Sequence, residues 1–426
     1  MGPEEQPAPA QPQPEPAPAP HEPAPAPHEP APAPLLLREP ADGIPPVTGT
    51  ERGLDAAARA VAAGEGPVAI DAERASGYRY GQRAYLVQVR RDGAGTWLID
   101  PMGVPDLGPL GEAIGAAEWI LHAATQDLPC LAEVGLRPVQ LFDTELAARL
   151  LGLGRVGLAA VVEHYLGLSL AKEHSAVDWS TRPLPEPWLR YAALDVEVLG
   201  ELRNLMGVDL AAQGKDEWAR QEFDALTRWA PVERVDPWRR LSGITKLSSR
   251  RDLAVARELW YERDAIAQER DISPGRIIPD AFLLEIDKAH PRTPADLPGG
   301  NRAVARYARR WLAAVARGNA VPEGELPPRA LRTGGPPPVR AWADKDPAAA
   351  ARLAATRAAL QDFSVAHTVP IENICSPDPL RRVVWSPPPV PDVDSFAAAL
   401  AAEGCRAWQC EIVAPLLVAA FADHPS

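Results

Sequence analysis

Two carboxylates follow a short apolar stretch near residue 70. Residues 68–70 (Val-Ala-Ile) predict a buried strand that continues through Asp71 to Glu73. Because side chains alternate between the two faces of a strand, Asp71 and Glu73 project to the same side. Two carboxylates side by side repel each other, and the adjacent base is Arg74. Such a pair is suited to binding a hard divalent cation through oxygen ligands. The alternative is a solvated turn at the end of the strand. Matching acids elsewhere in the chain would favour the metal site.

Two further acids follow predicted strands. Asp127 lies just beyond an apolar strand predicted at 119–122, and Asp143 ends a strand predicted at 139–142. Taken singly, each is expected to be a helix cap or a surface charge. Asp143 directly precedes a predicted helix, for which it is a candidate cap.

A fifth acid, Asp195, lies in a strongly helical stretch from Pro187 to about Leu205. Tyr191 precedes it by four residues, so the two side chains share one helix face about one turn apart. An isolated tyrosine at this offset usually serves packing. Together with the other acids, Tyr191 and Asp195 instead indicate a functional site.

These residues need a sheet to position them. The hydrophobic periodicity predicts a helix at 50–63, and two strands at 84–90 and 96–100 joined by a hairpin turn, which makes this part of the sheet antiparallel. Helices and strands then alternate, with helices at 106–117, 128–134, 144–151 and 157–166. The predicted fold class is an α/β domain with a mixed sheet and flanking helices, in the order of ribonuclease-H-like nucleases.

The motifs resemble the Tyr-containing branch of the DEDD 3′–5′ exonucleases, and in particular the ribonuclease D family. The matching segments are Asp71-Ala72-Glu73, His122…Asp127, Tyr191…Asp195 and Asp178-Trp179-Ser180-Thr181-Arg182-Pro183-Leu184. Ala72 departs from relatives, which often carry Thr or Cys there, but this position points away from the acidic face.

The resemblance implies a metal-dependent phosphodiester hydrolase. Asp71, Glu73, Asp127 and Asp195 would hold two Mg²⁺ or Mn²⁺ ions, which activate water and neutralise the leaving oxygen. Tyr191 would orient or deprotonate the attacking water. His122 is expected to form hydrogen bonds at the edge of the core and not to bind metal, since these ions favour oxygen ligands.

Composition is compatible with a nucleic-acid enzyme despite a formal net charge of −13. Residues 1–50 hold seven acids against one base, Arg38, whereas residues 236–325 hold 16 Lys and Arg against 13 Asp and Glu. Scattered cysteines argue against structural zinc and a disulfide framework. No apolar run approaches the roughly 18 residues of a membrane span. We therefore predict a cytoplasmic protein with no membrane association and no small-molecule cofactor.

The C-terminal half is predicted to be helical. Residues 253–280 resemble the helicase-and-RNase-D C-terminal (HRDC) domain, and its last helix carries Arg302, Arg306, Arg309 and Arg310. Their spacing would place them on one basic face, which predicts contact with RNA phosphates; a solvated face is the alternative. Residues 349–420 repeat the helical pattern faintly. The predicted organisation is a disordered Pro/Ala-rich tail at 1–45, an exonuclease domain at 46–230, an HRDC domain at 231–325, a linker at 326–345 and a second, degenerate HRDC-like domain at 346–426.

The resulting hypothesis is a 3′–5′ exoribonuclease that trims tRNA precursors and other small structured RNAs with 3′ extensions. The alternatives are an exonuclease that acts on DNA ends and a non-catalytic RNA-binding scaffold. The presence of all four acids and the tyrosine counts against the scaffold.

Overall fold

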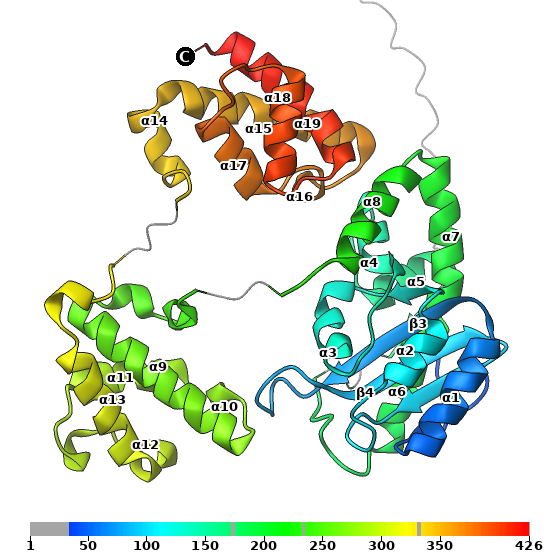
Figure 1. Cartoon of the computed structure of the whole chain (residues 1–426), viewed down its shortest axis with the longest axis horizontal. Helices are drawn as coiled ribbons and strands as arrows, with labels where there is room; N and C mark the ends of the chain where they lie inside the picture. The colour runs from blue at the N-terminus through cyan, green and yellow to red at the C-terminus, as the bar shows by residue number, and fades with distance from the viewer. Residues whose placement is uncertain (1–33, 172–173, 175, 232–234, 330–333, 426) are drawn as a thin grey trace, which may run out of the picture.

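The computed structural model describes residues 34–171, 174, 176–231, 235–329 and 334–425. Three bodies follow one another along the chain in Figure 1: an α/β domain, a helical region in green to yellow, and a second helical region in orange to red. Only the α/β domain contains a sheet of more than two strands among the described residues.

A six-stranded mixed sheet forms the centre of the α/β domain. Its strand order is β2-β5-β4-β3-β6-β7. The strands β3, β4 and β5 form an antiparallel meander, while β6 and β7 run parallel to β3. The predicted mixed sheet and its hairpin are therefore confirmed. The bounds are β2 (Val47–Thr48), β3 (Glu65–Arg74), β4 (Ala84–Asp92), β5 (Gly95–Ile99), β6 (Glu118–Leu121) and β7 (Gln140–Asp143).

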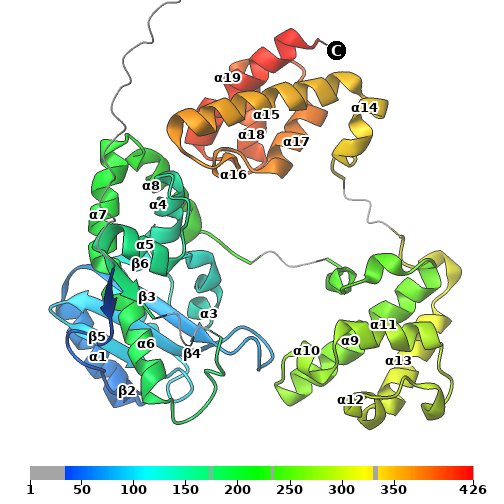
Figure 2. The same cartoon turned by 180° about the vertical axis from the view of Figure 1, so that it is seen from behind.

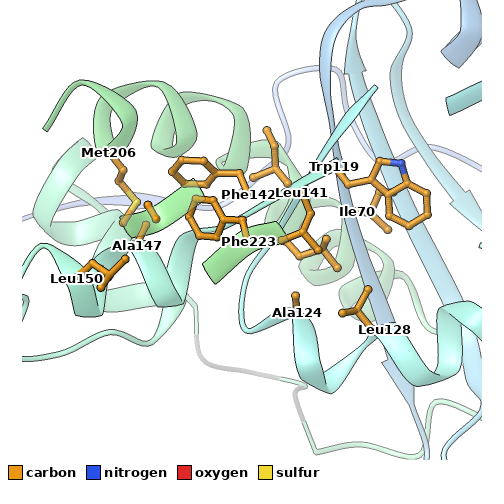
Figure 3. Packing of buried hydrophobic residues seen from close by; sticks show 14 of the residues in the cluster. Ile70, Trp119, Ala124, Leu128, Leu141, Phe142, Ala147, Leu150, Met206 and Phe223 are labelled. Atoms are coloured by element: carbon orange, nitrogen blue, oxygen red, sulfur yellow. The ribbon is translucent and has the colours of Figure 1, made fainter. Parts of the chain in front are cut away.

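Helices cover both faces of this sheet (Figures 1 and 2). A buried core joins them, and Figure 3 shows part of it, with Phe142 of β7 beside Phe223 of α8 at a ring-centroid distance of 4.7 Å. The helices are α1 (Glu51–Ala63), α2 (Gly108–Ile114), α3 (Leu128–Glu133), α4 (Thr144–Leu150), α5 (Leu158–Leu166), α6 (Glu186–Glu197), α7 (Leu199–Ala212) and α8 (Asp216–Thr227).

The central strand β3 separates apolar from acidic side chains by simple alternation. Ile70 and Ala72 are buried in the main core, at 0% and 5% exposure. Asp71 and Glu73 face the opposite side, where α6 packs across β3, β4 and β5. The predicted helix 187–205 is divided at Val198 into α6 and α7, and α6 carries the Tyr191–Asp195 pair. Sheet and helix thus bring two distant acidic motifs to one interface.

The C-terminal helical region shares the core of the α/β domain. It comprises α14 (Trp342–Lys345), α15 (Pro347–His367), α16 (Ile371–Ile374), α17 (Pro377–Trp385), α18 (Val393–Ala402) and α19 (Ala407–Asp423). Trp408 stacks on Trp218 of α8 with ring centroids 4.8 Å apart, and its indole N–H donates to Glu222. The ammonium of Lys215 donates to the carbonyls of Leu150 and His367, each at 2.7 Å. These contacts fix the region against α4 and α8.

The first helical region has its own core, and it contacts the α/β domain through hydrogen bonds and through the packing of Tyr80 against that core. It comprises α9 (Arg250–Arg270), α10 (Pro274–Ile277), α11 (Asp280–Ala289), α12 (Arg302–Arg306) and α13 (Ala308–Ala320). Its α10 end lies beside the loop that joins β3 to β4 (Figure 1). The Tyr80 hydroxyl donates to Asp264 at 3.0 Å, and the Ser273 amide donates to the Tyr78 carbonyl at 3.0 Å.

Two predictions of local structure are wrong. The predicted disordered tail, residues 1–45, extends too far along the chain. Leu35–Leu37 form β1, which pairs in parallel with β8 (Leu168–Leu170). Residues 1–33 lie outside the described part of the chain. The predicted arginine helix is also not continuous, because Tyr307 separates α12 from α13 with φ −108° and ψ 21°. None of the described helices is both long and apolar enough to cross a membrane.

Candidate active site

The acids of β3 and α6 converge at one point. Carboxylate oxygens of Asp71, Glu73 and Asp195 all lie within 4.8 Å of one another. They line a pocket of about 240 Å³ that also includes Asp127 and Tyr191. The structure therefore brings together all five residues that the sequence predicts for catalysis.

Asp127 occupies a different position from the other three acids. It begins α3, and one of its carboxylate oxygens lies 3.6 Å from the guanidinium of Arg74. Arg74 follows Glu73 directly, so the strand that carries two of the acids also carries the cation that faces the fourth. The sequence identified Arg74 as a basic neighbour of the acids, but its pairing with Asp127 depends on the tertiary fold.

Burial is the main influence on the charges of this cluster. It raises the pKa of Glu73 well above the usual range, and the carboxylates of Asp71, Asp195 and Asp127 raise it further. The pKa of Asp195 is also raised well above its usual range by burial and by Asp71. Removal from water disfavours the charged form of each acid, and the neighbouring charges add to the effect. An added cation would offset both effects.

Tyr191 lies in the same pocket as Asp195, one turn earlier on α6. Burial, followed by the charge of Asp195, raises the pKa of the phenol above its ordinary value. In the protein without bound cations the phenol therefore keeps its proton at neutral pH. Its hydroxyl can donate one hydrogen bond and accept another.

The loop before α6 is anchored by Arg182. Its guanidinium donates two hydrogen bonds to Asp100, each at 2.7 Å, and one to the carbonyl of Tyr85. Trp179 of the same loop is fully buried. The segment 178–184 thus ties the start of the Tyr191 helix to β4 and to the end of β5, which explains why a motif without metal ligands accompanies the acids.

Asp143 and His122 have the structural roles that the sequence predicts. Asp143 caps α4 by accepting from the amides of Glu145 and Leu146, and it also accepts from those of Ala123 and Ala124 at 3.1 and 2.8 Å. His122 contacts the Thr144 hydroxyl at 2.9 Å, and burial lowers its pKa to about 4. The carboxylate of Asp143 therefore fixes the turn that leads to Asp127.

One polar residue beside the site was missed in the sequence. Gln88 lies opposite Asp71 in the register of β3 and β4 and is fully buried. Neither its amide nitrogen nor its oxygen has a hydrogen-bond partner among the described residues. The available signal was a single polar side chain within the otherwise apolar start of β4.

Of the four arginines predicted to bind RNA, Arg310 differs from the other three in its contacts. Arg310 is bound by Glu262 and by Glu269 of α9, the latter at 2.6 Å, so its charge is already neutralised within the domain. Arg302, Arg306 and Arg309 are exposed. Binding of RNA by these arginines stays a prediction.

Comparison with known proteins gives the same class of protein as the fold and the acid cluster. Residues 47–211 match the family described as 3′-5′ exonuclease, residues 252–315 match the HRDC domain, and residues 335–421 match the 3′ to 5′ exonuclease C-terminal domain. The α/β domain is a 3′–5′ exonuclease domain. A second HRDC-like domain at the C-terminus, like the predicted domain boundaries, stays a prediction.

Individual relatives identify the family. A ribonuclease D from Jannaschia sp. is 36% identical over 277 residues, which cover 61% of this chain and 71% of that protein. A crystal structure of a protein from Bifidobacterium adolescentis is 38% identical with a TM-score of 0.82, covering 91% of this chain and 100% of that one. Escherichia coli RNase D, described as an exoribonuclease involved in structured RNA processing, is 26% identical with a TM-score of 0.66, covering 89% and 99%.

The chain belongs to the ribonuclease D family. It is a 3′–5′ exoribonuclease, and its substrate class is RNA. The cluster of Asp71, Glu73 and Asp195 fits a divalent metal ion, because buried carboxylate oxygens that raise one another's pKa are suitable ligands for a hard cation.

The role of Asp143 can be tested by Asp143→Ala. The substitution leaves four amide donors without their acceptor, and we expect it to lower the free energy of unfolding by roughly 3–5 kcal/mol. Asp106→Ala is the matched control, because exposed Asp106 accepts from the single amide of Gly108 and its loss should cost about 1 kcal/mol. Urea unfolding measures both. Equal losses in the two variants would show that Asp143 is an ordinary cap.

Proposed function

We propose that this exoribonuclease trims the 3′ ends of tRNA precursors and other small structured RNAs in the cytoplasm, by hydrolysis with two divalent metal ions. The observation that carries the proposal is the convergence of Asp71, Glu73 and Asp195, with one carboxylate oxygen of each within 4.8 Å of the others, in a pocket that Tyr191 also lines. Three carboxylates at this separation, two buried and that of Asp71 partly buried, are unfavourable without cations. Asp127, in the same pocket, would complete the set of ligands.

Each residue has a distinct proposed task. Asp71, Glu73, Asp127 and Asp195 would hold the two Mg²⁺ or Mn²⁺ ions, which when bound supply an activated water and neutralise the leaving oxygen. The guanidinium of Arg74, 3.6 Å from an oxygen of Asp127, would lie beside an ion held by that carboxylate. The protonated Tyr191 would orient the attacking water by a hydrogen bond.

The first prediction concerns the acids. Asp71→Asn or Asp195→Asn should abolish cleavage while RNA binding and folding change little, because loss of one ligand charge disrupts the metal site without opening a cavity in the core. Initial rates on end-labelled RNA and DNA of the same sequence, with Mg²⁺, Mn²⁺ or EDTA, measure this. Asp55→Asn, at an exposed position of α1, is the matched control and should keep full activity. Activity that survives EDTA, or an active Asp71→Asn protein, would contradict the mechanism, and a preference for DNA would contradict the substrate class.

The second prediction concerns the HRDC domain. We propose that the exposed arginines Arg302, Arg306 and Arg309 hold the body of a structured RNA through its phosphates. Replacing all three by Ala should weaken binding of a tRNA-like substrate and flatten its salt dependence by up to about one unit per lost contact. Arg310 is left unchanged, since its ion pairs with Glu262 and Glu269 stabilise the domain.

Filter binding over a salt series, with initial rates on a tRNA-like RNA and on a short single strand, provides the test. The short strand is the internal control, because it need not reach α12 and α13. An unchanged salt slope together with unchanged rates on both RNAs would show that these arginines form a solvated surface.

A further inference from the structure

A second pocket adjoins the acidic pocket along α6. Its volume is about 260 Å³, close to the lower end of the range of small-molecule sites, roughly 300 Å³. It shares Tyr191 and Asp195 with the acidic pocket, so a ligand that occupies it lies next to the reacting groups. Its remaining lining includes Leu194 of α6 and residues 36–39 at the start of the described chain.

The wall at residues 36–39 lies outside the region matched by the exonuclease family, which begins at residue 47. In Figure 2 the dark-blue strand β1 passes beside α6. Three contacts hold this segment in place: Arg190 to Glu39 at 2.8 Å, the Ala41 amide to Glu197 at 3.0 Å, and Arg90 to Asp42 at 3.0 Å, besides the pairing of β1 with β8. Two of these contacts involve α6. The segment is therefore a fixed part of the site in this chain.

The chemistry of the pocket is mixed. Leu36, Leu37 and Leu194 provide apolar surface, and Leu36 keeps 42% of its surface exposed. Of the two arginines in the lining, Arg190 is neutralised by Glu39 and Glu186. Arg38 is exposed and has no ion pair among the described residues. Residues 1–50 contain seven acids, and Arg38 is their single Lys or Arg. An apolar surface with one available guanidinium suits a ligand that has a flat apolar face and a phosphate.

We propose that this pocket is a nucleotide-binding subsite, in which one nucleotide of the RNA next to the scissile phosphate places its base against Leu36 and Leu37 and its backbone phosphate against Arg38. The subsite rests on the exoribonuclease function proposed above. Base contact with apolar side chains is tolerant of sequence, and so is phosphate contact, which fits an enzyme that removes successive nucleotides of any kind. Arg38 is thus a substrate-binding residue that lies outside the matched exonuclease region.

The binding test uses the full chain in an Asp71→Asn background, which keeps the RNA intact. An end-labelled single-stranded oligoribonucleotide is the probe, and filter binding is measured over a salt series. Adding Arg38→Ala should weaken binding about 5–10-fold and reduce the salt slope by about 0.7, the value for one phosphate contact on a single strand. Arg38→Lys should retain most of the affinity, because it keeps the charge. Leu36→Glu should weaken binding through repulsion of the phosphate.

Arg52→Ala is the matched control, since Arg52 is an exposed arginine of α1 and does not line the pocket. Kinetics in the otherwise wild-type chain give an independent measurement, in which Arg38→Ala should raise KM with little change in kcat. If the wild type cleaves RNA while Arg38→Ala and Leu36→Glu match the Arg52→Ala control in affinity, salt slope and KM, the subsite is refuted. If the wild type fails to cleave RNA, the proposed function itself fails, and the two failures are thereby distinguished.

Discussion

The mutual repulsion of buried carboxylates is the constraint on which the rest of this structure depends. Asp71, Glu73 and Asp195 are held within 4.8 Å of one another, largely out of water, and burial is the first cause of their raised pKa values. Such an arrangement persists only if the surrounding fold is stable enough to impose it. Three features contribute to that stability: the central position of β3 in the sheet, the packing of α6 across it, and the loop that Arg182 anchors.

Hydrogen bonds outside the acid cluster hold the segments that carry the acids in place. The carboxylate of Asp143 accepts hydrogen bonds from four backbone amides. The guanidinium of Arg182 joins the loop before α6 to Asp100. The C-terminal helical region extends the same core through Trp408 and Lys215. A helical region far along the chain thereby stabilises the domain that holds the metal ligands. The HRDC domain instead has a separate core, and Tyr80 of the loop after β3 both packs against that core and donates to Asp264.

Alternation and spacing predicted which residues share a face, and the resemblance to the ribonuclease D family predicted the chemistry. The period of a strand placed Asp71 and Glu73 on one face, and the i, i+4 offset joined Tyr191 to Asp195. What could not be predicted depends on distant parts of the chain meeting. The strand at Leu35–Leu37 forms only because β8, more than a hundred residues later, offers it an edge. Arg310 is neutralised by acids of α9, and Arg74 by Asp127. Such pairings leave no local pattern in the sequence.

The most direct test of the central claim is the effect of Mg²⁺ on the thermal unfolding of the wild type and of Glu73→Gln. The variant keeps the shape of Glu73 but removes one of the repelling charges. In EDTA it should unfold at a higher temperature than the wild type, because strained functional sites lower stability. Mg²⁺ should raise the midpoint of the wild type, since a ligand that binds only the folded state stabilises it. The shift in Glu73→Gln should be much smaller. A wild type that is unaffected by Mg²⁺, with a Glu73→Gln protein that is less stable in EDTA, would contradict the account.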